Sequence, residues 1–209
     1  MKKLLLLLCV VFCNYSTAQA KLAHEKEYWI EEISKTGVLN HNMISKHFNT
    51  SPESFAENIY GGSDSDMESW REITLVIAEI IKNNEANLKT LHIYGFNHKK
   101  FNTFYINTIL NAIVDNRTIQ SFSCTRVPAN GAFHVADIIK KNKTIKSIQP
   151  EDSDFTDEGA LVIAQSLGAN NTLQKLAIEN SKFSMSSRKA LRKAWSMNKV
   201  EGRQQDIAF

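Results

Sequence analysis

This chain of 209 residues has little cysteine and little glycine, and both shortages exclude classes of protein. Its eight glycines form no phosphate-cradling loop and no G-x-S-x-G elbow of the kind that presents a nucleophilic serine. No pair of histidines stands at helical spacing with a glutamate, and no cluster of cysteine and histidine is present. We therefore expect no catalytic residues, no cofactor and no metal.

The three cysteines are Cys9, Cys13 and Cys124. The first two lie in a segment that we expect to be removed, so the mature chain keeps only Cys124 and forms no internal disulfide. Stability must then come from packing. A repeat described below places Cys124 at an inward strand position, which favours a buried small hydrophobic side chain over a catalytic thiol.

Residues 1–20 have the layout of a secretory signal peptide. Two lysines precede an apolar run from Leu4 to Cys13, and the segment ends in the small-residue sequence AQA. The run is short for a membrane span, and its flanks disfavour a retained anchor. We predict cleavage after Ala20, an exported (periplasmic or secreted) mature chain, and no membrane span in that chain.

The charge balance does not suggest a nucleic-acid partner. The formal net charge is +3 and falls to +1 without Lys2 and Lys3, so no strong basic field is left. Charged residues make up 22% of the chain and hydrophobic residues 43%, which is ordinary for a globular protein. The length suits one domain, and we expect a monomer.

A helix–turn–strand unit recurs along most of the chain and is clearest from Thr156 to Ile178. Thr156 is a good helix cap, apolar residues follow on one helical face, and a short strand comes after the turn at Gly168. Each helix of the series ends in an asparagine, and the spacings are 32, 26, 28 and 28 residues. These asparagines are Asn84, Asn116, Asn142, Asn170 and Asn198.

Apolar residues hold fixed positions relative to these asparagines, which marks a solenoid whose units cannot bury their own apolar faces. Each helix has one inward residue seven positions before the asparagine and another three before it, and each strand has three. The helix columns are Ile77, Ile109, Val135, Ile163 and Leu191, then Ile81, Ile113, Ile139, Leu167 and Trp195. The strand columns are Leu88, Ile119, Ile145 and Leu173, then Leu91, Phe122, Ile148 and Leu176, then Ile93, Cys124, Pro150 and Ile178.

The turns between helix and strand lead to two further expectations. Asparagine tolerates left-handed backbone, so we expect the repeated asparagines to end the helices in that conformation. Three of them also match the N-glycosylation acceptor pattern, which the shared turn position explains without a glycan. Pro150 lacks an amide hydrogen, so we expect the third strand of the array to stop at Gln149.

The period near 28 residues, with DEGALVIAQSLGANNTLQKLAI as its clearest copy, resembles the ribonuclease-inhibitor class of leucine-rich repeat. That class is also found in NOD-like receptors and in the actin-capping tropomodulins. The resemblance covers about residues 67–197 and implies a right-handed α/β solenoid of about four parallel strands and five helices. Such repeats are generic binding scaffolds, so the resemblance implies a fold more than a function.

The remaining segments lie before and after this array in the sequence. Residues 21–66 do not fit the repeat and carry short amphipathic patterns, which predicts a helical N-terminal cap over the first repeat. Residues 67–198 form the leucine-rich-repeat array. Residues 199–209 have no periodic apolar pattern, and we expect a loosely ordered tail.

The strand side chains that point away from the helices are the candidate partner-binding residues. A parallel ladder holds them on a rigid, concave surface, so a protein partner binds with little ordering of the surface. Tyr94, Arg126 and His92 are the expected anchors, because aromatic and arginine side chains dominate binding hot spots. The full set is Lys89, His92, Tyr94, Gln120, Ser123, Thr125, Arg126, Lys146, Gln149, Glu151, Gln174 and Glu179.

The sequence thus predicts a non-enzymatic protein-binding module, namely an exported bacterial interaction or virulence-type protein with a protein partner and no nucleic-acid partner. Two alternatives remain open. One is an enzyme or metal binder sited in the N-terminal segment, using His24, His41 or His47. The other is a structural capping or bridging protein, as the resemblance to tropomodulin implies.

Overall fold

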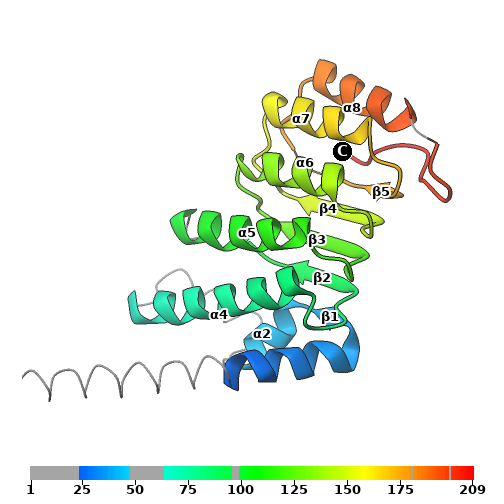
Figure 1. The fold of residues 1–209 in the computed structure, drawn as a ribbon. Coiled ribbons are helices and arrows are strands. Elements are labelled where there is room, and N and C mark those ends of the chain that lie inside the picture. Colours follow the sequence, from blue (N-terminus) through cyan, green and yellow to red (C-terminus); the bar gives the residue numbers. More distant parts are fainter. Residues whose placement is uncertain (1–23, 48–63, 96–98, 180, 198) are drawn as a thin grey trace, which may run out of the picture.

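The fold is a right-handed α/β solenoid of the leucine-rich-repeat type, in which helices cover one face of a parallel sheet (Figure 1). Within the part of the chain described below, no helix combines the length and the apolarity that a membrane span requires. The predicted signal peptide lies outside that part. The computed structural model of the protein describes residues 24–47, 64–95, 99–179, 181–197 and 199–209.

The strands stack in sequence order as one five-stranded parallel sheet, β1-β2-β3-β4-β5. Equivalent residues are register partners, so that Leu91 lies opposite Phe122, Phe122 opposite Ile148, and Ile148 opposite Leu176. The elements are β1 (Val38–Leu39), α2 (His41–His47), α4 (Asp64–Asn83), β2 (Thr90–Ile93), α5 (Lys99–Val114), β3 (Ser121–Thr125), α6 (Gly131–Lys141), β4 (Ser147–Glu151), α7 (Asp157–Leu167), β5 (Lys175–Leu176) and α8 (Met185–Met197).

The N-terminal segment adds a fifth strand to the four of the array. A helix over residues 24–36 buries Trp29 and Ile33 completely. It ends at Gly37, which has the positive φ of 68° that glycine adopts easily and donates its amide to the Ile33 carbonyl oxygen at 2.7 Å. The chain then enters β1, which pairs with β2 and extends the sheet. The first repeat is therefore covered by helix and by strand.

The inward columns predicted from the repeat are confirmed. Their side chains other than Pro150 have exposed fractions of 0–2%, and Pro150 is buried as well. All of them except Pro150 belong to a single apolar cluster between the helices and the sheet. Because each helix packs on the next, every repeat completes the core of its neighbour. The stability of each repeat therefore depends on the repeats beside it, as expected for a solenoid.

Pro150 differs from its prediction, because β4 continues through it and pairs it with Cys124. Alternate residues of a parallel strand bond to the same neighbouring strand. The Ile148 carbonyl oxygen accepts from the Ala177 amide at 3.1 Å, so the Pro150 nitrogen, two residues further on, faces the same side. There β5 has already ended, and the missing amide hydrogen breaks no ladder bond.

The repeated asparagines do not end the helices in the predicted way. Of those described, Asn84 alone has left-handed backbone, with a φ of 58°, whereas Asn142 is extended at φ −75° and ψ 137°. The side chains of Asn116, Asn142 and Asn170 are buried instead. Each of these three side chains bonds backbone groups of two repeats.

Asn142 shows the pattern most completely. Its Nδ2 donates to the carbonyl oxygens of Ile113 and Asn116 in the preceding repeat, at 3.0 and 2.8 Å. Its Oδ1 accepts from the amides of Thr144 and Ile145 in its own turn, at 2.8 and 3.0 Å. One side chain therefore bonds four backbone groups of two repeats. The two carbonyl oxygens also accept from the Asn116 amide and the Arg117 guanidinium, so it is the two amides that depend on this side chain.

Asn116 and Asn170 make the equivalent bond to the preceding helix, through the carbonyl oxygens of Ile81 and Ile139 at 2.7 and 2.6 Å. We refer to Asn116, Asn142 and Asn170 as the asparagine ladder. Their exposed fractions are 1%, 1% and 2%, and their side-chain nitrogens already donate within the fold. This structural role accounts for the N-x-T pattern without glycosylation.

The C-terminal segment differs from the predicted loose tail. Residues 199–209 run beside β5, where the Gln204 amide donates to the Gln174 carbonyl oxygen at 2.9 Å and the Ala208 amide donates to that of Leu176 at 3.3 Å. Ile207 is buried, with 3% of its surface exposed. Order here comes from backbone bonds and one apolar side chain, and neither produces a periodic pattern in the sequence.

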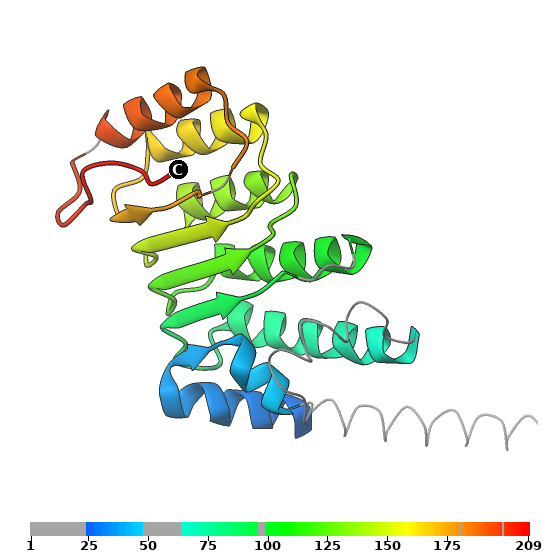
Figure 2. The ribbon, with the colours of Figure 1, turned by 180° about the vertical axis from the view of Figure 1, so that it is seen from behind.

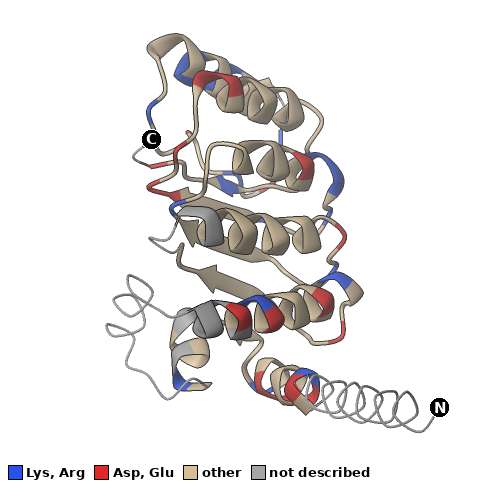
Figure 3. Ribbon diagram, turned by 90° about the vertical axis from the view of Figure 1, so that its left-hand side faces the viewer, with Lys and Arg blue, Asp and Glu red and all other residues tan. Residues whose placement is uncertain are grey.

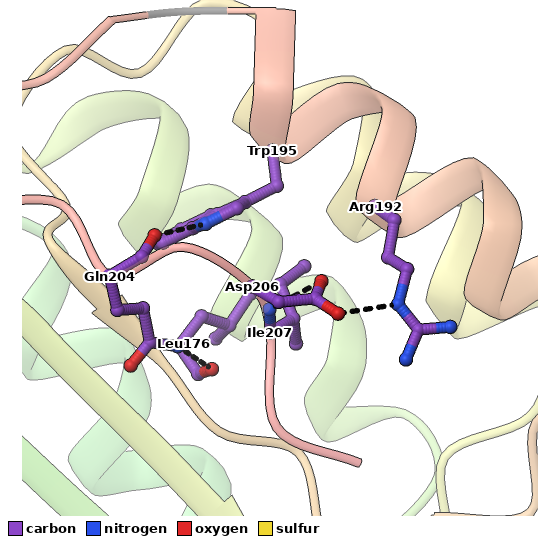
Figure 4. Close-up of polar contacts among 6 residues, drawn as sticks. All are labelled: Leu176, Arg192, Trp195, Gln204, Asp206 and Ile207. Atoms are coloured by element: carbon purple, nitrogen blue, oxygen red, sulfur yellow. Dashed lines mark hydrogen bonds and ion pairs between the residues drawn. The ribbon is translucent and has the colours of Figure 1, made fainter.

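Side chains of α8 fasten this segment (Figure 4). Trp195 Nε1 donates to the Gln204 carbonyl oxygen at 3.0 Å, and Arg192 Nε lies 2.8 Å from an oxygen of Asp206. The Arg203 guanidinium stacks on the Trp195 ring at 4.3 Å from its centroid. The ion pair is solvent-exposed and contributes little to stability. The Trp195 contacts hold the C-terminal segment against the last repeat.

Asp157 joins α7 to the segment that leads into α8. Thr156 occupies the cap position of α7 but makes no side-chain cap bond, so the predicted cap is wrong in that respect. The Ser184 amide donates to Asp157 Oδ1 at 2.8 Å, and this bond, helped by the nearby serine hydroxyls, holds the pKa of the carboxyl below its ordinary 3.8. The carboxylate form therefore supports the docking of α8.

Asp157→Ala is expected to destabilise the protein at neutral pH and to lose this effect in acid. The folded-state pKa is depressed, so the stabilisation is present above the unfolded value near 3.8 and disappears as the pH falls through the folded value. Urea-unfolding midpoints of wild type and variant, measured from neutral pH downwards, check this. A difference between the midpoints that stays constant across the range would contradict it.

Candidate protein-binding face

The candidate binding residues lie on the face of the sheet opposite the helices, which Figure 2 turns toward the viewer. Parallel strands send alternate side chains to this face, and in-register pairing aligns equivalent residues in rows. We refer to it as the open strand face. Its predicted members are exposed at Lys89, Tyr94, Gln120, Arg126, Lys146, Glu151 and Glu179, and partly buried at His92, Ser123, Thr125, Gln149 and Gln174.

The register brings the predicted rows together. Ser123 is the register partner of both His92 and Gln149, and Thr125 is the partner of Glu151. At the far end Gln174 is held by the C-terminal segment, because its Nε2 donates to the Glu201 carbonyl oxygen at 2.8 Å. The predicted residues therefore form one continuous surface, whose last repeat is partly shaped by the tail.

A further row was not identified from the sequence. Thr90, Ser121, Ser147 and Lys175 are register partners along β2 to β5 and alternate with buried residues, so they face outward. The sequence did contain a signal for this row. The first and second inward strand columns are three residues apart, so two outward positions lie between them, and only one of the two was identified. Three of the four side chains are small hydroxyls, which allow a partner to approach the backbone closely.

His92 Nδ1 and Ser123 Oγ are hydrogen-bonded across β2 and β3. A serine and a histidine are also the nucleophile and base of many hydrolases, in which a carboxylate orients the histidine. The outward neighbours of this pair in the rows described above are hydroxyl and amide residues, with no acid among them. The pair forms a cross-strand contact that fixes both side chains on the open strand face.

Arg126 stands on a tightly held turn after β3. Its backbone is left-handed, with a φ of 55°, and its carbonyl oxygen accepts from Asn102 Nδ2 at 2.8 Å. Its amide donates to the Glu151 carbonyl oxygen at 3.0 Å. Gly95 packs so closely that a Cβ there would lie 2.5 Å from the Thr125 carbonyl oxygen. The arginine side chain is exposed, and its Nη1 donates to the Gly95 carbonyl oxygen at 3.4 Å, so both its backbone and its side chain are positioned by contacts within the fold.

Charge differs between the two ends of the strands on this face. Lys89, Lys146 and Lys175 are exposed where the strands begin, whereas Glu151 and Glu179 are exposed beyond the other ends together with the basic Arg126. Hydroxyl and amide side chains lie between the two ends. A partner surface of matching polarity would be oriented along the strands by these charges.

Cys124 has the role expected of a core residue. Its side chain is 1% exposed, and burial raises the pKa of the thiol well above its ordinary value. The nucleophilic thiolate is therefore suppressed, and solvent does not reach the sulfur.

The N-terminal histidines provide no metal site within the described residues, where no group of three or more His, Cys, Asp or Glu is placed to hold an ion. His47 Nε2 lies 3.0 Å from Glu25 Oε2. The rings of Tyr28 and Trp29 pack beside it, with centroids 4.9 and 5.0 Å away. His47 thus joins α2 to the preceding helix.

Comparison with known proteins gives distant likenesses. No family model matches the chain. Leiomodin-2 of Rattus norvegicus is 27% identical over 177 residues, which cover 75% of this chain but 32% of leiomodin-2. The chain therefore spans about a third of that curated relative.

Two solved structures are also similar. One is described as leiomodin-1 actin-binding site 2 (ABS2), with 25% identity and a TM-score of 0.52, and the likeness covers 58% of this chain and 71% of that one. It agrees with the leucine-rich-repeat type of fold. The other is the tropomodulin C-terminal domain of Caenorhabditis elegans, at 15% identity, a TM-score of 0.40, and coverage of 63% and 92%, a likeness too weak to argue from.

Proposed function

We propose that this protein is a non-enzymatic protein-binding module that binds actin through its open strand face. The observation that carries the proposal is the likeness to the leiomodin-1 structure described as an actin-binding site, which extends over most of that chain. The period near 28 residues supports placing the array in the ribonuclease-inhibitor class. Export and a bacterial source rest on residues 1–20 alone and stay predictions.

Three properties of the open strand face support it as the binding surface. Its side chains stand on a regular parallel sheet, so little ordering is needed on binding. Tyr94 is 55% exposed and offers a large aromatic group, and Arg126 projects from a rigid turn beside it. Aromatic and arginine side chains are the groups that dominate binding energy when a partner buries them.

The double variant Tyr94→Ala, Arg126→Ala is expected to weaken actin binding about tenfold or more, because it removes both anchors. Co-sedimentation with actin filaments and a titration against monomeric actin measure the change. Alanine keeps a Cβ at position 126, so the steric demand on the left-handed backbone is unchanged, and the side-chain bond lost there is the 3.4 Å one to the Gly95 carbonyl oxygen. The matched control is Met185→Ala, which removes another exposed apolar side chain, 79% exposed on α8.

Unchanged binding by the double variant at an unchanged melting temperature would remove the open strand face from the proposal. Failure of the wild-type chain to bind either filamentous or monomeric actin would rule out actin as the partner. The alternative of a filament-capping protein depends on the same measurement, because a cap must bind actin.

A further inference from the structure

The last strand of the sheet, β5, has no bare edge, because the C-terminal segment runs beside it in parallel. The Gln204 amide donates to the Gln174 carbonyl oxygen at 2.9 Å, in the same way that the Gln174 amide donates to that of Lys146 at 2.7 Å. Further on, Ala208 forms a parallel bridge with Ala177. The segment therefore occupies the place that the strand of a next repeat would take.

The C-terminal segment fits this edge imperfectly. Gln205, Asp206 and Ile207 stand between its two paired residues, whereas only Lys175 and Leu176 stand between their partners on the β5 side. The extra residue makes a bulge, within which the Ile207 amide donates to Asp206 Oδ1 at 2.8 Å. A regular extended peptide pairs along the edge without such a bulge, so the edge can accept another strand in place of this one.

Side chains of α8 and of the core receive those of the segment. Ile207 is buried as part of the apolar core. The guanidinium carbons of Arg188 and Arg192 lie 5.2 and 4.9 Å from the centroid of the Phe209 ring. Arg192 also pairs with Asp206 (Figure 4). The β5 edge and α8 together thus accept an acidic, an aliphatic and an aromatic side chain at fixed positions.

The charge of α8 favours an acidic residue in the bound segment. The helix contains no Asp or Glu, and its Lys and Arg residues are coloured blue in Figure 3. Asp157 of α7, which lies at the start of α8, already accepts from the Ser184 amide. Asp206 is the acid that the C-terminal segment brings to this helix. Because that ion pair is exposed, it contributes to selectivity more than to affinity. The basic residues of α8 are Arg188, Lys189, Arg192 and Lys193.

The C-terminal segment competes with any partner for this place, because it is tethered to α8. A short tether gives a segment an effective concentration on the order of 1 mM, which a partner must overcome. The hold itself is local, since Ile207 alone is buried among residues 199–209. Weakening a few side chains of the segment should therefore open the place to a peptide from outside.

We propose that the β5 edge and α8 form a binding site for an extended peptide segment of a partner protein. The segment has an acidic residue, an aliphatic residue next to it and an aromatic residue two positions further on. Asp206, Ile207 and Phe209 of the chain itself occupy these positions in the structure. We refer to residues 203–209 as the latch, because they block the site in cis as an autoinhibitory contact.

The partner segment adds a parallel strand to the sheet. It uses the backbone groups that the latch now bonds, namely the carbonyl oxygens of Gln174 and Leu176 and the amide of Ile178. The site lies beside the last strand, whereas Tyr94 and Arg126 follow β2 and β3. It is therefore a second surface, beyond the one proposed for actin.

The probe is a fluorescein-labelled synthetic peptide with the sequence of residues 202–209, GRQQDIAF. It is titrated with the full chain, and binding is followed by fluorescence anisotropy. The double variant Ile207→Ser, Phe209→Ser weakens the latch and leaves the peptide unchanged. We expect this variant to bind the peptide at least about tenfold more tightly than wild type does, because its cis competitor is weakened. Met185→Ser, which changes a side chain 79% exposed on α8, should bind as wild type does.

Three further measurements test the recognition. A peptide with serine in place of its isoleucine and phenylalanine should bind the double variant about tenfold more weakly than the unchanged peptide does. Arg192→Ala, added to the double variant, should also weaken binding of the unchanged peptide. Asp206→Ala loosens the latch through an exposed side chain and should tighten peptide binding even where the double variant does not fold. The proposal is overturned if the loosened chains bind the peptide no more tightly than wild type, or if the serine peptide binds as tightly as the unchanged one.

Discussion

Asn142→Ala is expected to lower the free energy of unfolding by about 3–5 kcal/mol, since each buried backbone group left without a partner costs about 1–3 kcal/mol. The side chain is 1% exposed and serves two carbonyl oxygens of the preceding repeat and two amides of its own turn. Alanine serves none of them. The two carbonyl oxygens keep a bond from the Asn116 amide and the Arg117 guanidinium, so the loss comes mainly from the amides of Thr144 and Ile145. Equilibrium unfolding in urea measures the loss.

Asn84 provides the matched control, because it occupies the same position one repeat before the asparagine ladder begins. It is only half-buried, and its Oδ1 accepts a single bond, from the Arg117 amide at 2.6 Å. Its φ of 58° also suits glycine. Asn84→Gly should therefore cost less than about 1 kcal/mol. Equal losses at positions 84 and 142 would show that the ladder does not stabilise the array.

Phe122→Ala is expected to lower the free energy of unfolding by about 3–5 kcal/mol through the cavity it leaves. Phe122 is completely buried in the middle strand column, with Leu91 and Ile148 as its register partners. Because repeats depend on their neighbours, the cavity weakens the core on both sides of β3.

Phe133→Ala removes the same side chain from the solvent side of α6, where it is 46% exposed. It should change the free energy of unfolding by less than about 1 kcal/mol. Urea unfolding of the two phenylalanine variants side by side checks the assignment of inner and outer faces. Comparable losses in both variants would mean that the inward columns are misassigned.

The inward columns could be predicted because burial follows a strict position in the repeat. The residues seven and three positions before each asparagine, and the three in each strand except Pro150, lie in one core. The solenoid imposes this order on every copy at once, so that even divergent copies keep it. The outward rows of the open strand face follow from the same alternation.

The role of the asparagines was missed because one residue type suits two structures. Asparagine tolerates left-handed backbone, as at Asn84, and it also fits a buried turn in which both ends of its side chain are bonded. The signal that separates the two was the threonine two residues after Asn116, Asn142 and Asn170, whose amide the asparagine accepts from. Asn84 is followed by Ala86 instead.

Strand β1 and the C-terminal segment could not be predicted, because each is held by backbone pairing with a distant strand. Two residues in β1 and one buried side chain, Ile207, leave no periodicity to detect. The exposed positions of Leu75 and Leu161 on the helices were missed for a different reason. An exposed leucine in an amphipathic helix resembles a buried one in sequence, and only the packing of the helices shows which face is covered.

The binding of actin by the open strand face is tested most directly by a photo-crosslinker. Benzoylphenylalanine is placed either at Tyr94 or at Phe133, two exposed aromatic positions on opposite faces of the solenoid, and each protein is irradiated with actin. We expect a crosslinked product from position 94 and none from position 133. A product from position 133 alone, or from neither position at saturating actin, would contradict it.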